Sequence, residues 1–158
     1  MLKKKYSIKI INKIKPYKKS IFIDSDKSIS IRSFLIGSIS EGVSEVKNVL
    51  ESEDVMSTIN SLKKLGIKII KINNRNYKIY GKGLGSLAAK KNTVIDCGNS
   101  GTLARLLIGI LSTTPNIKVK MTGDKSLKNR NMSKLINLMN RFGAEFFPKN
   151  HLNFPLTL

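Results

Sequence analysis

The stretch Asp26-Lys27-Ser28-Ile29-Ser30-Ile31-Arg32, with the mostly apolar residues 33–37 after it, decides how the rest of the chain is interpreted. The apolar run 21–23 before it predicts a short strand, and the pattern from residue 28 to residue 39 predicts a helix. This order of a strand followed by a polar helix start is typical of an α/β protein.

The start of this predicted helix combines groups that bind anions. Ser28 is a suitable N-cap, since its hydroxyl can accept a hydrogen bond from a first-turn N–H. Ser28 and Arg32 are four residues apart and therefore share one face of a helix. Together with Lys27 and the free backbone N–H groups, they predict a site for a small anion.

The chain contains an internal repeat that is visible without any other sequence. Residues 27–40 align with residues 99–112 at an offset of 72, and the apolar residues of a second helix align at an offset of 77. Each unit reads strand, helix, strand, helix, strand, strand. The expected strands are 6–11, 21–23, 43–49, 67–72, 77–80, 93–96, 117–121, 144–147 and 154–158, and the expected helices are 28–39, 52–65, 99–110 and 132–142.

The second unit has a helix start of its own, Gly98-Asn99-Ser100-Gly101-Thr102. Glycine at this place lets a ligand approach the backbone N–H groups closely. Arg105 lies one turn further along, as Arg32 does relative to Ser28. Arg130 follows in a polar loop of the same unit. These residues predict that both units contribute to one site for a multiply anionic small molecule.

Composition limits the other functions. The net charge of +19 would suit a nucleic-acid partner, but 24 of the 29 basic residues are lysines spread along the whole chain. This distribution indicates a compositional bias, so we expect no nucleic-acid partner. No apolar run is long enough to cross a membrane, and the single cysteine, Cys97, provides neither a disulfide nor a zinc cluster. We expect a cytoplasmic protein without a metal site.

Two further features predict no catalytic chemistry. Gly81, Gly83 and Gly85 lack the strand-then-helix context of a dinucleotide-binding loop, which favours a flexible connection. His151 stands alone near the end of the sequence, as expected for a surface histidine. We therefore assign no catalytic residue and no cofactor.

Four ordered stretches resemble the 5-enolpyruvylshikimate-3-phosphate (EPSP) synthase family: residues 26–32, residues 50–55, residues 98–102 with Arg105, and Gly123-Asp124 with Arg130. The resemblance covers nearly the whole chain. It implies an enzyme of aromatic amino acid biosynthesis that transfers the enolpyruvyl group of phosphoenolpyruvate to shikimate 3-phosphate without a metal. It also implies an inside-out α/β barrel domain, built of βαβαββ modules with helices inside and sheets outside.

The resemblance assigns roles to individual residues. Lys27, Ser28 and Arg32 would bind shikimate 3-phosphate, and Lys27, Gly101 and Arg130 would bind phosphoenolpyruvate. Asn99, Thr102 and Arg105 are expected in support. Two positions depart from the family pattern: Ile31 replaces a polar residue beside the substrate, and Asn131 replaces a proline after Arg130.

The family enzyme is much longer than this chain. By the resemblance, residues 1–14 are a strand of a second domain, residues 15–90 are a first module and residues 91–158 are a second. A third module and the rest of the second domain would be absent, together with the general base. We expect a fragment that is monomeric, needs the carboxy-terminal portion and does not turn over alone.

Two alternatives remain at this point. A UDP-N-acetylglucosamine enolpyruvyl transferase shares the modules, but its usual Lys-Asn pair would replace Lys27-Ser28. A non-catalytic RNA- or polyanion-binding module would suit the charge, and it would bind RNA with a steep dependence on salt.

Overall fold

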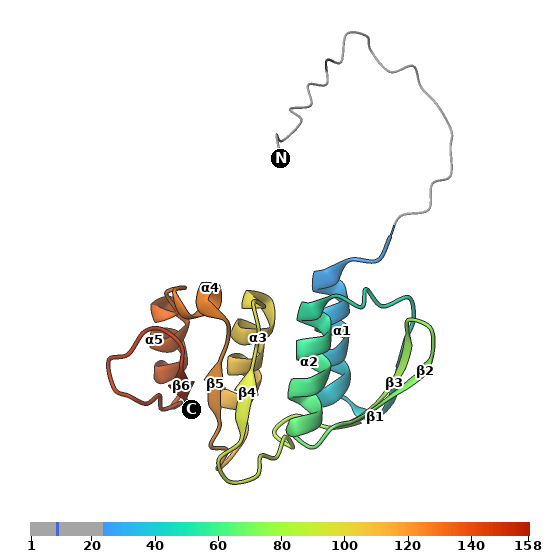
Figure 1. Cartoon of the computed structure of the whole chain (residues 1–158). Coiled ribbons are helices and arrows are strands. Elements are labelled where there is room, and N and C mark those ends of the chain that lie inside the picture. Colours follow the sequence, from blue (N-terminus) through green and yellow to red (C-terminus); the bar gives the residue numbers. More distant parts are fainter. Residues whose placement is uncertain (1–8, 10–23) are drawn as a thin grey trace.

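The computed structural model describes residue 9 and residues 24–158, and the expected strands 6–11 and 21–23 lie outside these residues apart from Lys9. The described chain folds as two α/β units joined by residues 83–93 (Figure 1). No helix among the described residues is long and apolar enough to cross a membrane.

The first unit contains two helices that cover one face of an antiparallel sheet. Its elements are α1 (Lys27–Ile39), β1 (Glu41–Val46), α2 (Glu53–Lys64), β2 (Lys68–Asn73) and β3 (Asn76–Lys82). The strand order is β1-β3-β2, so the last strand is central. The strand expected at 43–49 instead begins at Glu41 and ends at Val46, because Asn48 adopts a positive φ of 54°, which interrupts an extended strand.

The second unit contains β4 (Val94–Asp96), α3 (Gly101–Ser112), β5 (Lys120–Thr122), the short helix α4 (Lys125–Lys128), α5 (Ser133–Arg141) and β6 (Leu156–Thr157). The strand order is β4-β5-β6, with β4 parallel to β5 and β6 antiparallel to β5. The expected closing strands are reduced to β6 and a single bridge between Phe147 and Thr157. Pro148 and Pro155 explain this, since proline has no N–H to donate to a ladder.

The strand orders of the two units correspond. In the first unit β3 lies between β1 and β2, and in the second β6 lies between β5 and the bridge at Phe147. In both units, therefore, the strand after the first helix and the extended segment after the last helix lie on opposite sides of the final strand, which pairs with both. This shared path is what an internal repeat predicts.

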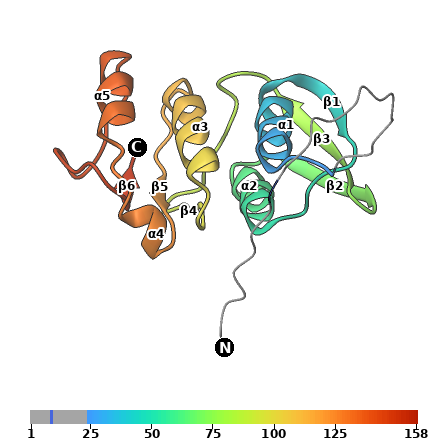
Figure 2. The ribbon, with the colours of Figure 1, turned by 90° about the horizontal axis from the view of Figure 1, so that it is seen from above.

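In the first unit, α1 and α2 lie on the inner side, toward α3 of the second unit, and the sheet lies outside them (Figure 2). Helix α1 packs against both α2 and α3, and α3 also packs against α5. The apolar residues expected on α2, Val55, Ile59, Leu62 and Leu65, are all buried. The core is therefore built largely between helices, and the sheet of the first unit covers α1 on its other side.

One expected pair of buried residues differs between the units. Ile36 and Ile108 occupy corresponding positions on α1 and α3, and both were expected in the core. Ile108 is 1% exposed, but Ile36 is 60% exposed. Helix α3 has α1 on one side and α5 on another, whereas no described element covers α1 at Ile36.

The connection between the units is ordered instead of loose. Gly83 and Gly85 adopt positive φ angles of 88° and 77°, which glycine allows at low cost. Leu87 is buried, and the N–H of Ala88 donates to the carbonyl of Leu65 at 3.1 Å. The glycines thus shape a packed turn, where a flexible connection was expected.

Candidate anion-binding site at three helix N-termini

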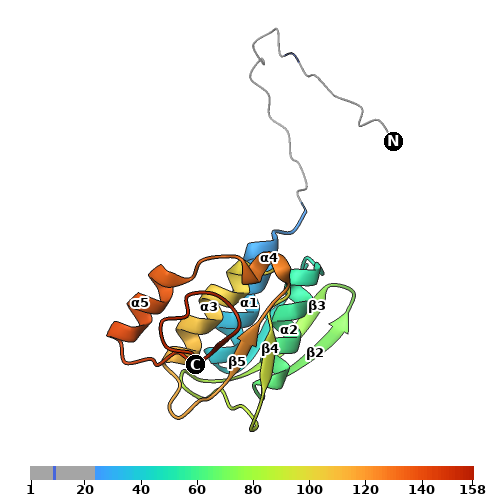
Figure 3. The same ribbon diagram turned by 60° about the vertical axis from the view of Figure 1, so that its left-hand side comes forward.

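The first turns of α1, α2 and α3 meet at one end of the molecule, the end at which α4 also lies (Figures 1 and 3). They enclose a pocket of about 230 Å³. The lining residues are Lys27, Asp54, Asn99, Gly101, Thr102, Arg105 and Arg130. Three helix N-termini and three cations at one place favour binding of an anion.

Helix α1 is capped by Asp26 and not, as expected, by Ser28. The Asp26 carboxylate accepts a hydrogen bond from the N–H of Ile29 at 2.7 Å, so the helix begins at Lys27. An Asp can cap as well as a Ser, and the cap fixes the direction of the first turn. The Ser28 hydroxyl is consequently not used in capping.

Helix α3 begins at Gly101, two residues after the expected start at residue 99. The buried Ser100 caps it, accepting a hydrogen bond from the N–H of Leu103 at 3.2 Å. Gly101 follows directly, and a Cβ atom at this position would lie 2.6 Å from Nη1 of Arg130 and 3.0 Å from Nη1 of Arg105. A side chain at this position would therefore displace the two guanidinium groups from the start of the helix.

Arg130 is held over this helix start by its own segment. Asp124 caps α4 through the N–H of Leu127 at 2.7 Å, and its own N–H donates to the carbonyl of Gly98 at 2.9 Å. The Arg130 guanidinium then donates to the side-chain oxygen of Asn99 at 2.8 Å. A loop that follows in sequence is thereby connected to the start of α3.

The structure brings together six of the eight residues expected at the site: Lys27, Asn99, Gly101, Thr102, Arg105 and Arg130. Ser28 and Arg32 lie next to this group on α1 but do not line the pocket. Ser28 is half-buried and Arg32 is exposed.

The two departures from the family pattern have structural explanations. Ile31 is fully buried in the core of the first unit, so its side chain does not face the pocket. Asn131 accepts a hydrogen bond from the N–H of Ser133 at 2.7 Å. Its side chain thus supports the start of α5.

One residue of the pocket was missed as a site residue. Asp54 lies in the first turn of α2, and its Oδ2 is 2.9 Å from Nζ of Lys27. From the sequence, Asp54 was assigned no role of its own. Its place in residues 50–55, one of the four stretches that carry the family resemblance, was the available signal.

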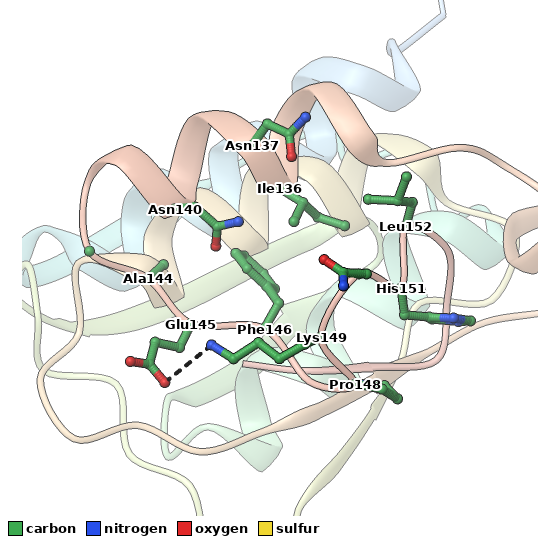
Figure 4. A pocket seen from close by; sticks show the side chains of 12 residues that line it. Ile136, Asn137, Asn140, Ala144, Glu145, Phe146, Pro148, Lys149, His151 and Leu152 are labelled. Carbon is green, nitrogen blue, oxygen red and sulfur yellow. Dashed lines mark ion pairs between the residues drawn. The ribbon is translucent and has the colours of Figure 1, made fainter.

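Another pocket, of about 350 Å³, lies between α5 and residues 143–152 (Figure 4). Its lining contains no arginine and none of the expected site residues. Glu145 and Lys149 face each other across it at 3.7 Å, and His151 lies at its edge and is exposed. Nothing in this pocket suggests a multiply charged ligand.

The remaining candidates for chemistry are inert or absent. Cys97 is fully buried, and the loss of solvation, with the nearby Asp96 charge, raises the pKa of its thiol to about 12. It is therefore protonated and unreactive at neutral pH. Among the described residues, no group of histidine, cysteine and acidic side chains could hold a metal ion.

The fold and this pocket together define a class: an α/β repeat protein with helix N-termini and cations gathered at one end. Comparison with known proteins identifies the family. The family model for EPSP synthase (3-phosphoshikimate 1-carboxyvinyltransferase) matches residues 11–157, so the chain belongs to the EPSP synthase family.

Individual relatives agree with this family. The chain is 37% identical over 147 residues to the 3-phosphoshikimate 1-carboxyvinyltransferase of Syntrophomonas wolfei. The aligned residues cover 93% of this chain and 34% of that protein. It is 42% identical over 138 residues to the enzyme of the same name from a Thermoanaerobacter species. These residues cover 87% of this chain and 32% of that protein.

A solved structure, an EPSP synthase from Acinetobacter baumannii, superposes with a TM-score of 0.79 at 33% identity, covering 87% of this chain and 31% of that one. This match confirms the expected fold class, the modular α/β barrel of enolpyruvyl transferases. The chain spans about a third of the length of the relatives that it matches.

Proposed function

We propose that this chain forms one side of an active site that transfers the enolpyruvyl group of phosphoenolpyruvate to shikimate 3-phosphate. The family supports the reaction, and one observation supports the site: Lys27, Gly101, Arg105 and Arg130 line a single pocket although they come from both units. Substrates rich in phosphate and carboxylate need such cations and helix-start N–H groups.

The proposed roles of the residues follow their positions. Gly101 offers its backbone N–H, and Arg130 its guanidinium group, to phosphoenolpyruvate. Ser28 and Arg32, which lie beside the pocket on α1, would bind shikimate 3-phosphate, and Lys27 would lie between the two substrates. Clamping both substrates in line lowers the barrier by positioning and by stabilising developing charge. Asn99, Thr102 and Arg105 would support these contacts.

We further propose that residues 15–90 and 91–158 are two of three modules of one domain, and that residues 1–14 belong to the other domain. The corresponding strand orders of the two units support this division. So do the exposed apolar side chains of Ile29 and Ile36 on α1, and of Leu106 on α3, which a third module would cover.

The opposing side of the site, including the general base, would then come from the portion that corresponds to the remaining two thirds of the relatives. The chain would otherwise be monomeric. A buried, unpaired Cys97 suits a reducing compartment, in agreement with action in the cytoplasm.

A chimera tests the function directly. Residues 1–158 replace the aligned third of the Syntrophomonas wolfei relative, and phosphate release from phosphoenolpyruvate is measured with and without shikimate 3-phosphate. We expect release that depends on shikimate 3-phosphate in the chimera and none from the 158-residue chain alone. A chimera that folds but does not turn over would contradict the proposal, and robust turnover by the chain alone would contradict the need for the remaining portion.

Substitutions in the chimera separate a discrete site from general charge. Lys27→Ala, Arg32→Ala and Arg130→Ala each remove a charged contact, at a cost of about 2–5 kcal/mol in transition-state binding. The control is Lys90→Ala with Lys91→Ala, two exposed lysines far from the pocket. If the control lowers kcat/KM as much, and salt removes both effects, the protein is a polyanion binder.

A further inference from the structure

Asp54 forms an ion pair with Lys27 inside the candidate site, and no role is yet assigned to it. Oδ2 of Asp54 lies 2.9 Å from Nζ of Lys27, and the two side chains are 18% and 48% exposed. Asp54 is the only acidic residue among those that line the pocket. A carboxylate at this place is unexpected, because it should repel the anion that the pocket is proposed to bind.

The pair contributes little to folding. Ion pairs between partly exposed side chains are typically worth about 0–1 kcal/mol, because solvent screens them and both side chains lose freedom. The contribution of this ion pair to stability is therefore too small to explain an aspartate at position 54. The position of Asp54 in the pocket gives a better explanation.

Lys27 needs a partner if its ammonium group is to remain in the pocket. It is a point charge on a flexible stem of four carbon atoms, and it shares the pocket with Arg105, Arg130 and the N-termini of three helices. These positive groups repel it toward the solvent. Asp54, fixed in the first turn of α2, provides the opposing attraction. Asn99 holds the guanidinium group of Arg130 in a comparable way.

We propose that Asp54 is a positioning residue, which holds the ammonium group of Lys27 where it meets the anionic substrate. The inference depends on the proposed function, since it assigns Asp54 a part in the same site. Asp54 acts through Lys27 and does not itself contact the substrate.

The sign of one substitution separates this role from simple electrostatics. Asp54→Asn removes a negative charge from a cationic pocket. If Asp54 acted only through its charge, phosphoenolpyruvate would bind more tightly to the variant. If Asp54 positions Lys27, binding becomes weaker despite the more positive pocket.

The experiment is a calorimetric titration with phosphoenolpyruvate of the chimera, in which the Syntrophomonas wolfei relative supplies the opposing side of the site, carried out on four variants. These are Asp54→Asn, Asp54→Glu, Lys27→Met, and Lys27→Met combined with Asp54→Asn. Glu53→Gln is the matched control, because Glu53 lies in the same first turn of α2 and is exposed. Urea unfolding of each variant shows that it is folded.

We expect Asp54→Asn to bind about tenfold more weakly, the size of effect expected when a hydrogen bond to a charged group is lost. Asp54→Glu keeps the charge and retains most of the affinity, and Glu53→Gln binds as the unsubstituted chimera does. In the Lys27→Met background, Asp54→Asn changes nothing further, because its effect passes through Lys27.

The outcomes distinguish this inference from the function on which it depends. If the chimera without these substitutions does not bind phosphoenolpyruvate, both the proposed site and the role of Asp54 are wrong. If that chimera binds, but Asp54→Asn binds equally or more tightly, only the role of Asp54 is wrong. A loss that persists in the Lys27→Met background would also overturn it.

Discussion

At the scale of single residues, Tyr77 connects the hairpin of the first unit to the segment that leads into α2. Its hydroxyl donates to Oε1 of Glu51 at 2.6 Å, and its ring meets Phe34 of α1 edge to face, with 5.3 Å between ring centres. Burial, followed by the Glu51 carboxylate, raises the pKa of Tyr77 to about 12. The same hydroxyl, after Lys71, lowers the pKa of Glu51.

Tyr77→Phe should therefore change how stability depends on pH. An unfolded tyrosine ionises near pH 10, whereas Tyr77 in the folded chain keeps its proton to about pH 12. As the pH rises through this window the unfolded state releases a proton first, so the wild type loses stability. We expect the variant to be about 1 kcal/mol less stable at neutral pH and to lose less stability above pH 10. Urea unfolding at several pH values measures both effects, and equal alkaline slopes would contradict the argument.

At the scale of elements, the start of α1 decides where the site lies. The N-cap is Asp26, which places Lys27 in the first turn and leaves the Ser28 hydroxyl out of the cap. Asp26→Ala should lower the free energy of unfolding by about 1 kcal/mol through the lost cap. Ser28→Ala should leave it nearly unchanged. If urea unfolding shows the larger loss for Ser28→Ala, Ser28 caps the helix in solution.

At the scale of the whole molecule, the repeated helices α1 and α3 have unequal surroundings. Ile108→Ala should lower the free energy of unfolding by about 2–5 kcal/mol, because Ile108 is fully enclosed. Ile36→Ala, at the corresponding but exposed position, should change it by less than about 0.5 kcal/mol.

The same pair tests whether another module covers α1. In the chimera with the Syntrophomonas wolfei relative, Ile36→Ala should become destabilising, because Ile36 would then be buried. Thermal unfolding of the chimera and of the 158-residue chain measures the difference. An unchanged small effect in the chimera would show that no further module packs on this face of α1.

The sequence alone determined the class of fold, the positions of most elements and six of the residues that line the pocket. Helix periodicity and the alternation of apolar residues are local signals, and they place α2, α3 and the hairpin of β2 and β3 to within two residues of the observed bounds. The repeat predicted that α1 and α3 are equivalent. The grouping of Lys27, Gly101 and Arg130 followed from that equivalence and from the family resemblance.

Only the tertiary structure decided how these residues meet. Asp54 lies 27 residues after Lys27, and nothing in their spacing places them 2.9 Å apart; the packing of α2 against α1 does. Ile36 and Ile108 have similar local sequence but opposite burial, because burial depends on which neighbours arrive from elsewhere in the chain. Caps and periodicity are properties of a few adjacent residues. Ion pairs and burial arise between segments distant in sequence, so the sequence pattern predicted the elements better than the contacts between them.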